Sequence, residues 1–138
     1  MFSKETHILV VDDALNIRRV ICDSLNRLGF TRIVTAEDAN EAMGKLVYFA
    51  KGSTPIDLVL SDLNMPGPSG LDFLKQVRET EDLKELPFIL ITTESEKGAV
   101  IEAAVSGVSG YVVKPFNMET LTQRLQEAWN KHYRSKSA

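Results

Sequence analysis

Five short apolar runs of strand length, each followed by a stretch with helical periodicity, constrain the fold of this chain more than any other feature. The runs end at Val11, Ala36, Ser61, Thr92 and Val113. Most are unbroken β-branched or aliphatic segments, which is typical of strands covered on both faces. The alternation predicts an α/β fold, with five βα units arranged around a parallel five-stranded sheet.

The stretches between these runs have the apolar spacing of helices. The first helix, after Asp13, should end near Gly29, because glycine commonly closes a helix. The second should begin at Asp38, where Glu41 is placed three residues later as in a capping box. The other helices are expected to start near Ser69, to end at Gly107, and to contain Leu121, Leu125, Ala128 and Trp129.

Length and composition are those of one domain. With 138 residues, of which 43% are hydrophobic, the chain can bury a single sizeable core. We therefore expect one domain over residues 1–138. Its core should run from about residue 6 to about residue 130, followed by a polar tail over 131–138.

Several classes of protein are disfavoured by the composition. A net charge of -3 provides no basic surface for nucleic acid. The single cysteine, Cys22, cannot form an internal disulfide, which favours a reducing compartment. No apolar run approaches the roughly 18 residues of a membrane span, and the N-terminus lacks the apolar segment of an export signal. We expect a cytoplasmic protein that neither binds nucleic acid nor inserts into a membrane.

Ionisable and hydroxyl side chains gather at the predicted C-terminal ends of the strands. Asp12 and Asp13 follow the first strand, Asp62 follows the third, Thr92 ends the fourth and Lys114 follows the fifth. In an open α/β sheet, ligands bind outside these ends, where the strand order reverses. If the first and third strands are neighbours there, three carboxylates converge beside one ammonium group.

Three carboxylates in close contact are unfavourable unless a positive charge lies among them. Oxygen ligands without a cysteine or histidine cluster favour Mg²⁺, which accepts one or two carboxylates and keeps waters or phosphoryl oxygens as its other ligands. Lys114 would oppose a phosphoryl oxygen, and the Thr92 hydroxyl would donate to another. Asp62, alone at the end of the central strand, is best placed as the nucleophile. These residues predict a magnesium-dependent phosphoryl site.

The chain also contains four longer motifs in a fixed order. They are VVDD at 10–13, SDLNMPGPSGLDFLK at 61–75, LPFILITTESE at 86–96 and GVSGYVVKPF at 107–116. Their order and spacing resemble the receiver domains of two-component response regulators, in particular the CheY-like receivers of chemotaxis, from about residue 6 to residue 129. The resemblance implies a doubly wound, flavodoxin-like (βα)5 fold with the strand order 2-1-3-4-5.

The resemblance also implies a role for each site residue. Asp62 would accept a phosphoryl group from a histidine kinase, and Thr92 and Lys114 would bind the phosphoryl oxygens. A cis peptide bond before Pro115 would turn Lys114 inward. The Mg²⁺ would be held by Asp12, Asp13, Asp62 and the main-chain carbonyl of Asn64.

Four residues are expected to control the phosphorylated state. Phosphorylation should draw the Thr92 hydroxyl inward, so that Tyr111 can fill the space vacated beneath the fourth helix. Thr92 and Tyr111 are therefore the predicted switch residues. Asn64 and Glu94, which lie two residues beyond Asp62 and Thr92, match the CheY-like pattern. The resemblance implies that they modulate autodephosphorylation and that the phosphoryl group is short-lived.

Three features depart from the CheY-like pattern. Leu63 stands where those receivers have a large aromatic residue, and Thr93 stands where they have alanine. These two replacements imply a reshaped mouth of the phosphoryl pocket. The connection around residues 49–55 is also about five residues longer.

We expect a phosphoacceptor signalling protein, not an enzyme with a separate substrate. The resemblance implies a single-domain response regulator that receives its phosphoryl group from a histidine kinase and changes its binding to an output partner. For CheY-like receivers that partner is the flagellar motor switch, and a phosphatase is a further candidate partner. A phosphorelay intermediate or a phosphate sink is the alternative within the same class.

Two other classes of protein fit these residues less well. A Mg²⁺-dependent phosphohydrolase of the haloacid dehalogenase type would place its nucleophile and acid as Asp-x-Asp after the first strand, whereas Asp12 and Asp13 are adjacent. A flavin mononucleotide carrier would need a loop rich in glycine, serine or threonine at that place. The carboxylates of VDDALN would instead repel its phosphate.

Overall fold

Five strands form one parallel sheet in the computed structural model, which describes residues 1–93 and 97–134. The strand order is β2-β1-β3-β4-β5, as expected from the resemblance to receiver domains. Each strand ends at the residue that the sequence pattern predicts. The strands are β1 (Ile8–Val11), β2 (Ile33–Ala36), β3 (Leu58–Ser61), β4 (Phe88–Thr92) and β5 (Gly110–Val113).

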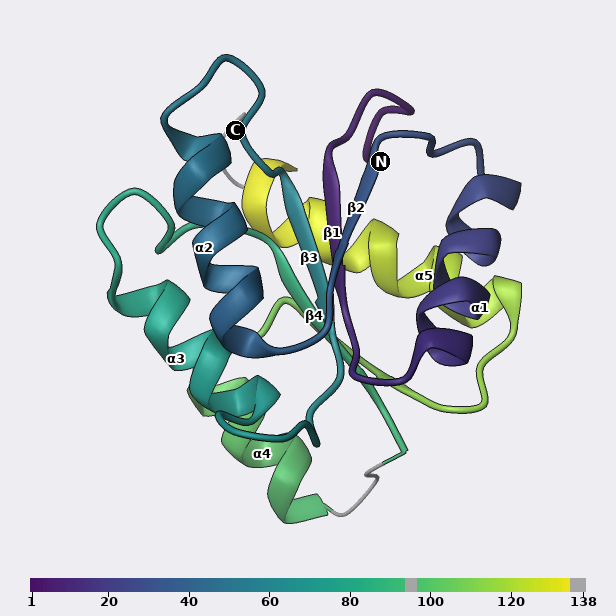
Figure 1. The fold of residues 1–138 in the computed structure, drawn as a ribbon. Helices are drawn as coiled ribbons and strands as arrows, with labels where there is room; N and C mark the ends of the chain where they lie inside the picture. Colours follow the sequence, from purple (N-terminus) through teal and green to yellow (C-terminus); the bar gives the residue numbers. More distant parts are fainter. Residues whose placement is uncertain (94–96, 135–138) are drawn as a thin grey trace.

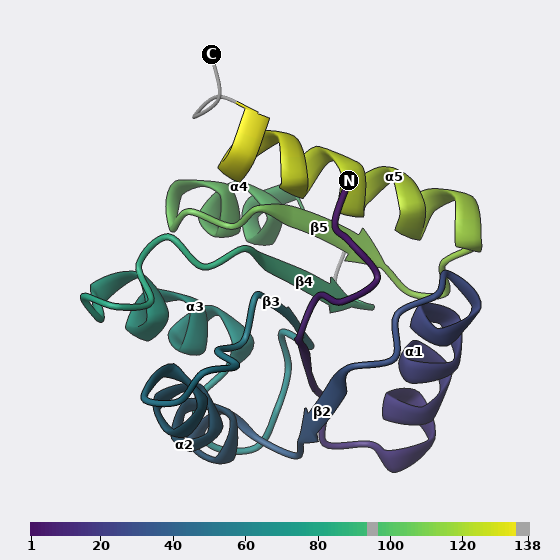
Figure 2. The same cartoon turned by 90° about the horizontal axis from the view of Figure 1, so that it is seen from above.

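The helices cover both faces of the sheet (Figures 1 and 2). One face is covered by α2 (Ala39–Ala50), α3 (Gly70–Glu79) and α4 (Lys97–Val105), and the other by α1 (Leu15–Arg27) and α5 (Met118–Trp129). This arrangement confirms the predicted doubly wound α/β fold. Among the described residues, none of the helices combines the length and the apolar character that crossing a bilayer requires.

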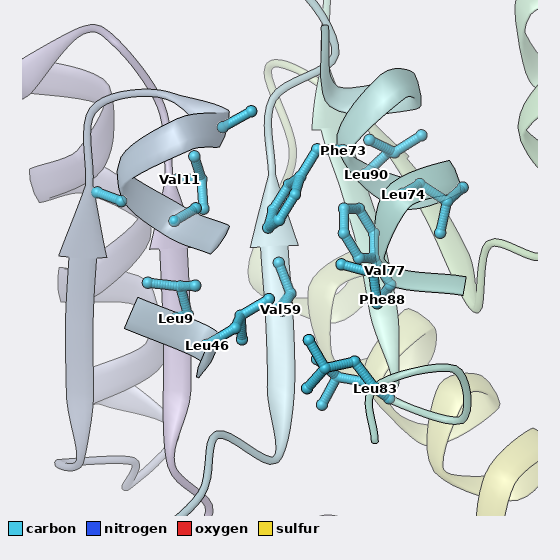
Figure 3. Packing of buried hydrophobic residues seen from close by; sticks show 14 of the residues in the cluster. Leu9, Val11, Leu46, Val59, Phe73, Leu74, Val77, Leu83, Phe88 and Leu90 are labelled. Carbon is cyan, nitrogen blue, oxygen red and sulfur yellow. The ribbon is translucent and has the colours of Figure 1, made fainter. Parts of the chain in front are cut away.

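The central strands are buried on both sides, which explains their unbroken apolar sequences. Every residue of β1, β3 and β4 is buried. Alternate side chains enter opposite cores, so that Leu9 packs towards α2 and α3 while Ile8 packs towards α1 and α5. Figure 3 shows the first of these cores, where the rings of Phe73 and Phe88 meet edge to face with centroids 5.2 Å apart.

The N-termini of α2 and α3 are capped by side chains. Asp38 accepts a hydrogen bond from the main-chain N–H of Glu41 at 2.8 Å, as predicted. The complete capping box lies at α3 instead, where Ser69 and Asp72 each accept a hydrogen bond from the main-chain N–H of the other. The Glu41 carboxylate lies 3.2 Å from the ammonium group of Lys45. The capping-box pattern therefore located the start of α2 but not the partner of Glu41.

The two ends of the chain extend the core beyond the 6–130 span. After Trp129 the chain continues as a π-helical turn over Asn130–Arg134. Phe2 is 5% exposed, and its ring meets those of Trp129 and Tyr133 edge to face at 5.3 and 6.1 Å. The sequence pattern did not indicate this cluster, because the segment that contains Tyr133 reads as polar.

Candidate functional site

The carboxylates of Asp12, Asp13 and Asp62 meet at the C-terminal edge of the sheet. Strands β1 and β3 pair in parallel with Val11 opposite Ser61, so that the loops that follow them start side by side. One carboxylate oxygen from each of the three residues lies within 4.8 Å of the others. The strand order thus brings together residues that are about 50 positions apart in the sequence.

Lys114 supplies the positive charge beside this cluster. Its ammonium nitrogen lies 2.8 Å from Asp12 Oδ2 and 3.6 Å from Asp62 Oδ2. The side chain of Asp12 is only 2% exposed, so water screens its pair with Lys114 weakly. The peptide bond between Lys114 and Pro115 is cis, as predicted.

Thr92 lies at the end of β4, between the strands that carry Asp62 and Lys114. Its side chain is fully buried, and its hydroxyl donates a hydrogen bond to the Asp62 carboxylate. The main-chain N–H of Leu63 donates to Asp62 Oδ1 at 2.8 Å. Asp62 therefore has a fixed orientation before any ligand arrives.

The environment of Asp62 works against its ionised form. Burial raises the pKa of the Asp62 carboxyl above its ordinary value of 3.8. The Lys114 ammonium is the largest influence in the opposite direction, whereas the negative charge of Asp12 adds to the rise. A cation among the three carboxylates would lower the pKa of Asp62, because it would stabilise their ionised forms.

The donor set is suited to a hard divalent cation. Three carboxylates supply oxygen ligands alone, which is the ligand chemistry that Mg²⁺ prefers. Within residues 1–93 and 97–134, this is the one group of three or more acidic, histidine or cysteine side chains close enough to share a metal ion. Asp13 is the exposed member and faces solvent, from which a metal ion and its remaining waters would come.

The other predicted site residues have different surroundings. Asn64 is exposed, two residues beyond Asp62. Tyr111 lies on β5, half-buried against the core that α3 and α4 cover. Glu94 lies outside the described residues. The structure therefore gathers Asp12, Asp13, Asp62, Thr92 and Lys114 into one site, and Tyr111 lies two residues before the end of β5.

The departures from the CheY-like pattern fall in different places. Leu63 is 9% exposed and packs in the core that α2 and α3 cover. Thr93 is exposed and lines a groove with a volume of about 510 Å³, between α1 and the connection from β5 to α5. Within the longer connection, the main-chain carbonyl of Thr54 lies 2.9 Å from Nδ1 of His7. This connection is therefore held at the N-terminal end of β1, far from the carboxylates.

Arg18 is a site residue that the sequence reasoning missed. Its side chain is 11% exposed, and its Nη1 donates to the main-chain carbonyl of Asp12 at 2.6 Å. A signal for its burial was available, because Arg18 stands three and seven residues before Ile21 and Leu25. All three residues therefore fall on the buried stripe of α1.

Gly70 is a second residue that was missed. It begins α3 directly against the main chain of Asp62, and its N–H donates to the carbonyl of Leu63 at 2.7 Å. A Cβ atom built at Gly70 would lie 2.0 Å from the main-chain oxygen of Asp62. Because this neighbour is backbone, it cannot rotate away as a side chain would.

We expect Gly70→Ala to lower the free energy of unfolding by about 3 kcal/mol, because the methyl group forces α3 away from Asp62. Chemical denaturation of the metal-free protein measures this change. Gly44→Ala is the matched control, since a Cβ atom there meets nothing within 4 Å. Gly44 lies inside α2, so alanine should raise the stability there by about 1 kcal/mol. Equal stabilities of the Gly70 variant and the native chain would contradict the close approach.

Comparisons with known proteins agree with the fold over nearly the whole chain. The family model of the response regulator receiver domain matches residues 8–126. The chain is 40% identical over 131 residues to the chemotaxis protein CheY-3 of Vibrio cholerae, which covers 95% of this chain and 97% of that one. It is also 40% identical over 124 residues to the chemotaxis protein CheY of Pseudomonas aeruginosa, with 90% and 96% of the two chains covered.

Solved structures extend the same comparison. The chemotaxis response regulator CheY4 of Vibrio cholerae superposes with a TM-score of 0.77 at 35% identity, covering 90% of this chain and 98% of that one. The phosphorylated cyanobacterial phytochrome response regulator RcpA superposes with a TM-score of 0.74 at 27% identity, covering 93% and 94%. The likeness therefore includes both sequence and fold.

Proposed function

The chain belongs to the response regulator receiver domain family, and from this premise we propose that Asp62 accepts a phosphoryl group in a Mg²⁺-dependent reaction. The observation that carries the proposal is the cluster of three carboxylates within 4.8 Å of one another, with the Lys114 ammonium beside them. A phosphoacceptor of this kind is a signalling protein, because the phosphoryl group changes the protein itself and no separate substrate is converted.

Each site residue has a chemical task in this reaction. A carboxylate oxygen of Asp62 attacks the phosphorus, and the bond from phosphorus to the donor breaks. Lys114, 3.6 Å from Asp62 Oδ2, neutralises a phosphoryl oxygen, and the Thr92 hydroxyl donates to another once it leaves the carboxylate. When bound, Mg²⁺ supplies charge neutralisation and alignment. Its proposed ligands are Asp12, Asp13, Asp62 and the main-chain carbonyl of Asn64.

The proposed phosphodonor is a histidine kinase. The groove that contains Thr93 and Lys114 lies beside the carboxylates and is lined mostly by apolar side chains from α1 and the connection from β5 to α5. Val20, on the wall that α1 contributes, is 53% exposed. An apolar helix of the donor could pack there while its phosphohistidine reaches Asp62. Asn64, with Glu94, is proposed to modulate the loss of the phosphoryl group afterwards.

The proposed output surface is the exposed side of α4 and β5. Ile101 and Val105 on α4 are 52% and 83% exposed, and Val113 on β5 is 41% exposed. Exposed apolar side chains of this kind favour a protein partner. Since two relatives are named chemotaxis proteins, we propose the flagellar motor switch as the partner and the cytoplasm as the place of action.

The proposed switch connects Asp62 to this surface through Thr92 and Tyr111. Thr92 and Leu90 alternate along β4, and Leu90 pairs with Tyr111 on β5. Leu90 belongs to the core under α3 and α4, and Tyr111 packs against that core, so the side chains of Thr92 and Tyr111 share one face of the sheet. Movement of Thr92 towards a phosphoryl group would therefore change the space available to Tyr111.

We expect Thr92→Ala to accept the phosphoryl group on Asp62. Phosphorylation of this variant should, however, change its affinity for the partner only slightly. In the native chain, phosphorylation should tighten partner binding about tenfold, or about 1.4 kcal/mol. In the variant the gain should fall to about twofold or less. Calorimetric titration of the motor switch protein with and without a phosphoryl mimic measures both values. If the phosphoryl mimic still increased the partner affinity of the variant tenfold, Thr92 would not be part of the switch.

The function is tested by adding Mg²⁺ and acetyl phosphate to the purified chain. Intact mass spectrometry should detect one acid-labile phosphoryl group, and chelation of the metal by EDTA should prevent its addition. The same samples are assayed for hydrolysis of p-nitrophenyl phosphate. Sustained turnover of that ester, with no phosphoryl group on the chain, would contradict the proposal and favour a phosphohydrolase.

A further inference from the structure

We propose that Arg18 positions the metal-binding carboxylates by holding the peptide group between Asp12 and Asp13. This inference rests on the proposed function, since it assigns Arg18 a part in the same site. Arg18 does not touch the reacting atoms. It acts through the main chain, and its loss should therefore change metal binding before it changes the chemistry of phosphoryl transfer.

The contacts of Arg18 are those of a buried anchor. Its Nη1 donates to the Asp12 carbonyl at 2.6 Å, and its Nη2 lies 3.8 Å from Glu37 Oε1. The Arg18 side chain is 11% exposed, whereas that of Glu37 is 69% exposed. Solvent screening makes the contact with Glu37 weak, so the bond to the carbonyl is the main reason for Arg18 to be buried there.

Asp12 is fixed by several contacts in addition to Arg18. Its Oδ1 accepts from the Ala14 N–H at 2.9 Å, and its Oδ2 lies 2.8 Å from the Lys114 ammonium. Its own main-chain N–H donates to the Ala36 carbonyl at 3.2 Å. Asp12 would therefore remain in place through β2, α1 and Lys114 even if Arg18 were replaced.

Asp13 has fewer contacts of its own than Asp12 has. It is exposed, and its side chain forms no hydrogen bond or ion pair with the residues that the structure describes. The peptide group that follows Asp13 is held by the bond from the Ala14 N–H to Asp12 Oδ1, and the peptide group that precedes Asp13 is held by the bond from Arg18 to its carbonyl oxygen. Fixing both peptide planes therefore aims the carboxylate of Asp13 towards those of Asp12 and Asp62.

The sign of the effect distinguishes positioning from simple electrostatics. A guanidinium charge close to the carboxylates repels a cation, so removing the charge alone should strengthen Mg²⁺ binding. Loss of positioning should weaken Mg²⁺ binding, since a mobile Asp13 must be ordered when the metal binds. The two roles thus predict changes in opposite directions for the same substitution.

The experiment compares Arg18→Met, Arg18→Lys and the matched control Arg19→Met by calorimetric titration with Mg²⁺. Arg19 is the exposed neighbour on α1, so its variant loses the same charge without losing the anchor. We expect Arg18→Met to weaken Mg²⁺ binding by about 10-fold to 100-fold. Arg18→Lys, which keeps the charge and one donor, should fall between Arg18→Met and the native chain. Arg19→Met should change the affinity by about twofold or less.

Further measurements separate positioning from a loss of folding. Thermal unfolding in EDTA gives the temperature below which each variant is fully folded, and the titrations are made below it. In phosphorylation by acetyl phosphate, Arg18→Met should need more Mg²⁺ for half the maximal rate but reach nearly the native rate at saturation. Unchanged or tighter Mg²⁺ binding by folded Arg18→Met would overturn the inference.

The native chain, titrated in parallel, separates this inference from the proposed function. If the native chain binds no Mg²⁺ or accepts no phosphoryl group, the proposed function is wrong. If the native chain does both and Arg18→Met binds Mg²⁺ equally well, the function stands and only the role of Arg18 is wrong.

Discussion

Replacement of Asp62 by asparagine is expected to abolish phosphoryl incorporation from acetyl phosphate and Mg²⁺. The amide of asparagine is not a nucleophile towards phosphorus, and Asp62 lies at the end of the central strand with both Lys114 and Thr92 beside it. Intact mass spectrometry should therefore detect no phosphoryl group on Asp62→Asn under conditions that label the native chain. If the variant were labelled at the native level, the phosphoryl acceptor would have to be another residue.

Stability measurements show whether the loss of labelling has a chemical cause. Burial raises the pKa of Asp62 above 3.8, so the folded protein binds this proton more tightly than the unfolded chain does. The contribution of Asp62 to the stability of the metal-free native chain should therefore fall as the pH rises from 3.8 through the raised folded pKa. Asparagine has no proton to lose. Near neutral pH in EDTA, Asp62→Asn should be the more stable protein.

This stability difference has a defined pH window. It should shrink as the pH falls and vanish below 3.8, where Asp62 is protonated in both states. Thermal unfolding in EDTA at a series of pH values measures it. A variant that is less stable than the native chain near neutral pH would show that the Asp62 carboxylate stabilises the fold, contrary to its surroundings.

Removal of the Asp13 carboxylate is expected to weaken Mg²⁺ binding by about 100-fold or more, or at least about 2.7 kcal/mol. Opposite unit charges about 4 Å apart near a protein surface attract by about 4 kcal/mol, and Mg²⁺ carries two. Asp13 is also the member of the cluster whose carboxylate is not already engaged, whereas Asp12 is paired with Lys114. With one carboxylate fewer, the site competes poorly with the hydration shell of the metal.

Calorimetric titration of Asp13→Ala with Mg²⁺ measures this effect. The matched control is Asp82→Ala, because Asp82 is also an exposed aspartate but lies in the connection between α3 and β4. The control should keep the native affinity. If Asp13→Ala bound Mg²⁺ with the native affinity, Asp13 would not be a ligand of the metal, even if Asp62 remained the phosphoryl acceptor.

The strands and helices were predictable because the apolar pattern within each short segment indicates which of its faces are buried. A strand covered on both faces, such as Leu58–Ser61, needs an unbroken apolar run, and few other local structures use one. The strand ends were equally clear, since Asp62 follows its run at once. Periodicity did not provide the strand order. That order came from the resemblance to receiver domains, and the convergence of Asp12, Asp13 and Asp62 depends on it.

The local contacts that support the site were not predictable in the same way. The position of Arg18 on the stripe of Ile21 and Leu25 indicated its burial, but not its partner. Arg18 and Gly70 both contact the main chain near the carboxylates, and the pattern of side chains does not show a main-chain partner. Glu41 pairs with Lys45 and does not complete a capping box, although both arrangements suit the same residues. The packing of Tyr133 on Trp129 and Phe2 joins the two ends of the chain, which local reasoning treats separately.

The sequence by itself determined which segments are strands and helices, and that carboxylates, a threonine and a lysine follow particular strands. Apolar spacing acts over a few residues, so it can be read without knowing the rest of the fold. The tertiary structure decided which of these side chains meet, how the Asp62 pKa is shifted, and that Arg18 holds the Asp12 carbonyl. These properties depend on distances of 3 to 5 Å between segments far apart in the chain, and only strand pairing and helix packing set such distances.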